Sequence, residues 1–109
     1  MKLWMVGVLL CLGLAPARAG FVDGLALLEY CKDPQSNLCG GYIAALVDYQ
    51  DALQATDSPA ITFCLPERSN LGGLRDMVID VLQRQTPREL QKNAASLVIP
   101  AFAKAFRCR

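Results

Sequence analysis

The sequence predicts an all-α fold, a small antiparallel bundle of four to five helices cross-linked by two disulfides. Apolar residues recur at the 3.6-residue period of a helix in several successive segments, and no stretch of useful length alternates as a strand would. The part of the chain expected to be exported has an even number of cysteines. Small exported domains use disulfides in this way to supplement a limited core.

The first 19 residues have the organisation of a secretory signal peptide. A lysine follows the initiating methionine, residues 3–14 form an apolar run, and Ala17 and Ala19 are the small residues that a signal peptidase requires. The run is shorter than the roughly 20 residues needed to span a bilayer. We therefore expect a cleaved signal, a single domain over residues 20–109, and no membrane attachment after cleavage.

Removing the signal leaves a nearly neutral chain. Residues 20–109 contain 9 basic and 10 acidic side chains, and lysine and arginine are scattered along the sequence. Proteins that bind nucleic acid collect phosphates on a basic face. Nucleic acid is therefore not an expected partner.

Two helices are expected in the first half of the domain. The first covers residues 21–30, and a turn over 32–37 contains Pro34. The second runs from residue 37 or 38 to about 55, with its apolar positions at helical spacing. Gly40 and Gly41 in its first turn predict close approach of a neighbouring backbone. Its expected structural positions are Gly41, Tyr42, Ile43 and Asp48.

The second half begins with an irregular connection over residues 56–70, in which Pro66 is a further structural position. Ser69 or Asn70 can cap a third helix over 71–83. A capping box at Thr86, with glutamate three residues later, predicts the start of a fourth helix. Pro100 lies inside that helix and is expected to kink or divide it.

Four cysteines remain after signal cleavage, which allows three disulfide connectivities. A zinc site is disfavoured because the chain has no histidine and no C-x-x-C pair. In an antiparallel bundle, Cys31 and Cys39 lie at one end of a hairpin. Cys64 precedes the third helix and Cys108 follows the fourth, at the opposite end. The preferred pairs are therefore Cys31–Cys39 and Cys64–Cys108.

The composition argues against an enzyme. Without histidine, Ser-His-Asp and Cys-His mechanisms are absent. The carboxylate pairs Asp48/Asp51 and Asp76/Asp80 are interpreted as solvated helix faces. The glycine pairs lack the spacing and preceding strand of a phosphate-binding loop. No catalytic residue, cofactor or metal ligand is predicted, and a binding protein remains.

A series of short motifs extends over nearly the whole mature chain. The motifs are Cys31, Cys39-Gly-Gly-Tyr42-Ile43 with Asp48, Phe63-Cys64-Leu65-Pro66, Thr86-Pro87, Ala94-Ala95-Ser96-Leu97-Val98 and Ala105-Phe106-Arg107-Cys108. Together they resemble the Rap/Tai family of periplasmic immunity proteins. The C-terminal motif departs from the family pattern at Arg107, where a proline is common.

This resemblance implies a helical, often homodimeric protein of the periplasm. Members bind a peptidoglycan amidase delivered by a type VI secretion system and block it sterically, by placing a protruding loop in its active-site groove. The expected contact residues are exposed polar loop positions on either side of the third helix. They are Glu67, Arg68, Ser69 and Asn70 before it, and Gln83, Arg84, Gln85 and Arg88 around the turn at its end.

A second hypothesis is a small periplasmic stress chaperone, or a binding protein without a cognate toxin. Such a chaperone would expose apolar surface after opening in acid. The lack of histidine argues against a switch near neutral pH, whereas carboxylates respond at lower pH.

Overall fold

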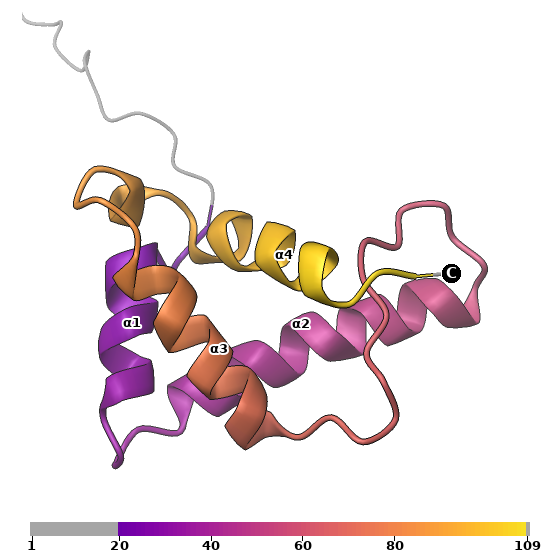
Figure 1. Ribbon diagram of the computed structural model, residues 1–109, viewed down its shortest axis with the longest axis horizontal. Coiled ribbons are helices and arrows are strands. Elements are labelled where there is room, and N and C mark those ends of the chain that lie inside the picture. Colours follow the sequence, from indigo (N-terminus) through magenta and orange to yellow (C-terminus); the bar gives the residue numbers. More distant parts are fainter. Residues whose placement is uncertain (1–19, 109) are drawn as a thin grey trace, which may run out of the picture.

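Four α-helices and one 3-10 turn make up the fold in the computed structural model, which describes residues 20–108 (Figure 1). The predicted signal peptide lies outside these residues. No β-strand occurs in the described part, so the all-α prediction is confirmed. The elements are α1 (Gly24–Lys32), α2 (Leu38–Ala55), α3 (Leu71–Gln83), η1 (Glu89–Gln91) and α4 (Ala94–Ala105).

The core draws side chains from all four helices and from the α2–α3 connection, residues 56–70. Phe63 of this connection is 1% exposed and meets Phe102 of α4 edge to face, with ring centroids 5.3 Å apart. Phe106 packs against the other side of Phe102 at 5.8 Å. The remaining buried apolar residues are Leu27, Leu28, Cys31, Cys39, Ile43, Leu74, Val78, Leu82, Ala94 and Val98.

The starts of α1 and α4 are joined by two backbone hydrogen bonds. The Gly24 N–H donates to the Lys92 carbonyl, and the Ala94 N–H donates to the Val22 carbonyl, both at 2.9 Å. Gly24 and Ala94 are the first residues of their helices, whose N–H groups have no partner inside the helix. The chain just before each helix therefore supplies a carbonyl acceptor for the first N–H group of the other helix.

Gly24 is required by the close approach of η1 and α4 to α1. A Cβ atom at this position would lie 2.6 Å from Leu97 Cδ1 and 3.2 Å from Leu90 Cα. By contrast, nothing lies within 4 Å of a Cβ at Gly40 or Gly41. The expectation that Gly40 and Gly41 allow close backbone packing is therefore wrong, because the first turn of α2 borders open space.

Helix starts differ from the sequence prediction in two places. The first helix begins at Gly24 rather than at residue 21, and Asp23 caps it by accepting the Ala26 N–H at 2.8 Å. Phe21 precedes the helix and is fully exposed. Thr86 does accept the Glu89 N–H at 3.1 Å, but the turn that it starts is only the 3-10 turn η1.

The helix containing Pro100 starts at Ala94, later than predicted, and is capped by Asn93. The chain leaves the helical conformation at Lys92, whose carbonyl bonds Gly24. Pro100 does not divide α4, which is continuous to Ala105. Pro100 is on the exposed side, where water can solvate the carbonyl that lacks an intrahelical partner.

Both predicted disulfides are present. Cys31–Cys39 joins the end of α1 to the start of α2, and Cys64–Cys108 joins the α2–α3 connection to the C-terminal segment. Their environments differ. The Cys31 and Cys39 side chains are buried in the core, whereas Cys64 is half-buried and Cys108 is exposed.

None of the helices in the described residues is long and apolar enough to cross a membrane.

Gly24→Ala is expected to lower the free energy of unfolding by about 1–3 kcal/mol, because the added methyl group overlaps a packed leucine and the η1 backbone. Gly41→Ala is the matched control. It places the same methyl group in open space within a helix and should raise the stability by up to about 1 kcal/mol. Urea unfolding with both disulfides intact measures the two effects. Equal responses would contradict the close-approach argument.

The two disulfides are expected to differ in their rate of reduction. Thiol–disulfide exchange requires access to a sulfur, so limiting reductant should open Cys64–Cys108 before Cys31–Cys39. Alkylation at short times, followed by peptide mass spectrometry, identifies the modified cysteines. Simultaneous labelling of both pairs would show that access does not control the order.

Candidate functional site

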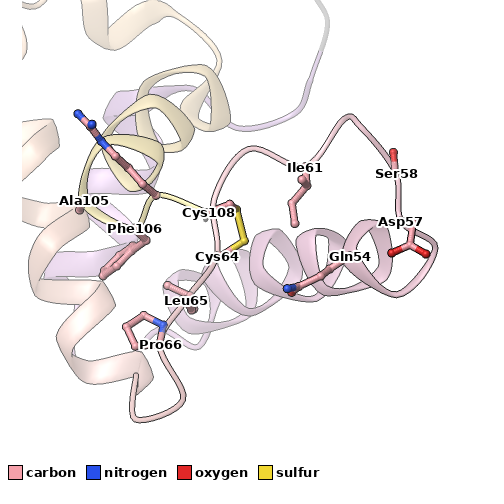
Figure 2. Close-up of a pocket in the computed structure, with 11 residues that line it drawn as sticks. Gln54, Asp57, Ser58, Ile61, Cys64, Leu65, Pro66, Ala105, Phe106 and Cys108 are labelled. Carbon is pink, nitrogen blue, oxygen red and sulfur yellow. A yellow bond between two sulfur atoms is a disulfide. The ribbon is translucent and has the colours of Figure 1, made fainter.

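An open hollow of about 720 Å³ lies between the end of α2, the α2–α3 connection and the C-terminal segment (Figure 2). The second half of α2 extends past the neighbouring helices, and the connection folds back along it (Figure 1). Within residues 20–108 no group of acidic or cysteine side chains is arranged to hold a metal ion. Polar and apolar side chains both line the hollow, with Asp57 as its acidic residue and Arg107 as its basic one.

The end of α2 is closed by a Schellman motif centred on Asp57. The Asp57 N–H donates to the Gln54 carbonyl at 3.1 Å, and the Ser58 N–H donates to the Leu53 carbonyl at 2.9 Å. Asp57 has φ +54°, the left-handed conformation in which this motif normally places glycine. Among the described residues it is the only one with a side chain beyond hydrogen at positive φ.

The connection beyond Asp57 is held at several points. Gln50, a buried polar residue of α2, accepts the Thr62 N–H at 2.9 Å through its Oε1. Two residues later, the Cys64 N–H donates to the Phe106 carbonyl at 2.9 Å, next to the Cys64–Cys108 disulfide. With Phe63 in the core, these bonds hold the connection in one shape against α2 and α4.

Charge divides sharply along the chain. Residues 20–67 contain one basic and seven acidic side chains, whereas residues 68–109 contain eight basic and three acidic ones. No lysine or arginine occurs between Lys32 and Arg68. The expectation of scattered charge is therefore wrong: the acidic excess lies in residues 20–67, and the basic excess lies in residues 68–109, chiefly in the segments outside α3 and α4.

The charges at the ends of α1 and α2 also differ. Lys32 lies in the last turn of α1, and Arg75 donates through Nε to the Cys31 carbonyl at 2.9 Å. These cations complement the negative end of the helix dipole. The last turn of α2 has no basic residue, and the acidic Asp51 and Asp57 lie close to its negative end. The electrostatics at this end of α2 therefore oppose folding.

The predicted contact residues before α3 lie in the α2–α3 connection and are exposed. Two of them have structural roles: Asn70 caps α3 by accepting the Gly73 N–H at 2.8 Å, and the Ser69 hydroxyl donates to the Pro66 carbonyl at 2.9 Å. Glu67 and Arg68 are exposed and make no side-chain hydrogen bond or ion pair within residues 20–108. They are the members of this group most available to a partner.

The predicted contact residues after α3 are also on the surface. Arg84 pairs with Asp80 at 2.9 Å, and Gln85 donates to the Val81 carbonyl at 3.0 Å. Gln83 and Arg88 are exposed. Since α3 separates the two groups by 13 residues, at 1.5 Å per residue they lie about 20 Å apart. The structure thus places the candidates on two separate surfaces.

The structural motif positions have distinct environments. Ile43 is fully buried, and Pro66 lines the hollow. Burial raises the pKa of the Tyr42 phenol above its ordinary value of about 10, and a hydrogen bond with the Ala95 backbone opposes this rise. Tyr42 is therefore a packing residue between α2 and α4. Asp48 is exposed, and Gly41 borders open space.

Sequence reasoning missed Gln50 and Asp57. Gln50 sits one turn from other polar residues of α2, and nothing in the helical pattern distinguishes a buried glutamine from an exposed one. Asp57 had a detectable signal, since it occupies the position after a helix where glycine is usual. The long interval without lysine or arginine was a second signal on the same part of the chain.

Comparison with known proteins yields one match. The family model of Rap1a immunity proteins matches residues 23–108. No curated protein and no solved structure matches the chain significantly. The family match extends from the residue that caps α1 to the cysteine that closes the second disulfide. The chain belongs to the Rap1a immunity protein family.

Proposed function

We propose that this protein is a periplasmic immunity protein that binds a peptidoglycan amidase effector of a type VI secretion system and inhibits it sterically. Family membership supports an immunity protein directed against a secreted effector. The observation that carries the steric mechanism is the α2–α3 connection, which projects with the end of α2 and is held in one shape. A preformed projection loses little conformational entropy when it enters a partner's groove.

Export to the periplasm is supported by the predicted signal peptide and by the two disulfides, which persist in oxidising compartments. The proposed inhibitor needs no cofactor. It acts by occupying the groove through which the amidase receives its peptide substrate. Homodimer formation, which the family resemblance implies, belongs to the same proposal. Light scattering of the purified mature chain measures the dimer directly.

The direct test is inhibition of peptidoglycan hydrolysis. Purified mature chain is titrated into type VI amidase effectors, including any that is encoded beside this chain, and release of peptide fragments is followed. Stoichiometric inhibition of at least one amidase is expected. Failure to bind or inhibit any of them, combined with holdase activity towards unfolded clients at pH 2–3, roughly where carboxylates protonate, would support the stress-chaperone alternative instead.

Paired alanine variants decide which predicted contact group faces the amidase. Glu67→Ala/Arg68→Ala alters the surface before α3, and Gln83→Ala/Arg88→Ala alters the surface after it. We expect the first pair to weaken inhibition by about 10- to 100-fold, in the range of interface hot spots, and the second to have a smaller effect. The first pair lies in the projecting connection.

Each pair is a control for the other, because all four side chains are exposed and neither change should alter the unfolding temperature appreciably. Loss of inhibition only in the second pair would move the contact surface to the α3–η1 turn. Wild-type inhibition by both variants would reject both surfaces.

A further inference from the structure

We infer that Asp57, at the tip of the projection formed by α2 and the α2–α3 connection, is a specificity-determining contact whose carboxylate pairs with a lysine or arginine in the groove of the effector. The inference rests on the proposed function and names a residue outside both predicted contact groups. Its basis is that the backbone conformation and the local charge at position 57 both favour a residue other than aspartate.

The backbone conformation at this position favours glycine. Asp57 has φ +54° within the motif that ends α2, a left-handed conformation that glycine adopts freely and that still costs an aspartate some strain, although Asp and Asn tolerate it better than other L-residues. Glycine would make the same two backbone hydrogen bonds without that strain. The side chain of Asp57 is therefore not needed to end the helix.

The charge at this position also disfavours folding. A carboxylate beside the C-terminal end of a helix is repelled by the partial negative charge of the free carbonyls. No basic side chain lies in the last turn of α2, and both ion pairs found in the described residues, Arg84–Asp80 and Lys92–Glu89, are in the other half of the chain. The Asp57 carboxylate therefore forms no ion pair within residues 20–108, and Arg107 is the one basic residue that lines the same hollow.

The position is suited to a protein contact. Asp57 is exposed, lines the open hollow, and lies at the far end of α2 (Figure 2). The chain after Asp57 is held by two hydrogen bonds, in which the Thr62 N–H donates to Gln50 Oε1 and the Cys64 N–H donates to the Phe106 carbonyl. Strained residues that persist at a cost to stability are concentrated at functional sites. A fixed, exposed carboxylate with no internal partner fits a cationic side chain on the binding protein.

Three single variants test the inference. Asp57→Gly removes both the strain and the charge, Asp57→Asn keeps a side chain that tolerates positive φ but removes the charge, and Asp76→Asn removes an exposed carboxylate of α3 as the matched control. Thermal unfolding and inhibition of the amidase are measured for each. Asp57→Gly should raise the Tm by about 2–6 °C, since relief of strain exceeds the entropy that glycine adds to the unfolded chain.

Both Asp57 variants should inhibit the amidase at least about tenfold less tightly than wild type, and the loss should be smaller at high ionic strength, where the pair is screened. Asp76→Asn should match wild type. A structural role alone cannot produce a variant that is more stable and binds less tightly. Wild-type inhibition by either Asp57 variant, or a lower Tm for Asp57→Gly, would overturn the inference.

The two proposals fail in different ways. If wild-type protein inhibits no type VI amidase, the proposed function is rejected and the inference falls with it. If wild-type protein inhibits an amidase and the Asp57 variants do so equally, the proposed function stands and only the inference is rejected.

Discussion

Burial of Phe63 against Phe102 links the scaffold to the surface that it presents. Phe63 lies in an irregular segment, yet it is as deeply buried as the helical core residues. Its ring draws the α2–α3 connection onto α4 and places Cys64 beside the C-terminal segment, where the disulfide and the Cys64–Phe106 hydrogen bond form. Without this packing, residues 56–70 would be a long loop between two helices, and the cost of ordering it would fall on partner binding.

Stabilising contacts and locally unfavourable features lie at opposite ends of the molecule. At one end the starts of α1 and α4 satisfy each other's donors, Gly24 admits the neighbouring backbone, and Arg75 complements the end of α1. At the other end, α2 projects with acidic side chains that form no ion pair within residues 20–108, and with a strained Asp57. Local sequence preferences agree with the structure at the first end and conflict with it at the second. Conflicts of this kind are expected at functional surfaces.

The division of charge adds a long-range component to this arrangement. Residues 20–67 carry the acidic excess and residues 68–109 carry the basic excess, and such charges affect the rate of association with a charged partner more than the final affinity. The disulfides contribute differently. The buried pair closes a short loop within the core, whereas the accessible pair closes a span of 44 residues and restricts the unfolded chain more strongly.

The sequence by itself determined the helical class, the disulfide pairing and the bounds of α3, and it narrowed the cap of α3 to Ser69 or Asn70. These features depend on local periodicity, cap chemistry and the order of elements along the chain. It also identified the family through short motifs. Only the tertiary structure decided where α1 and α4 begin, since hydrogen bonds between Val22–Gly24 and Lys92–Ala94 outweigh the capping box at Thr86. It likewise decided that Gly24, rather than Gly41, is the glycine needed for packing, and that the second half of α2 extends past the neighbouring helices. Each of these depends on neighbours distant in sequence, which local patterns do not encode.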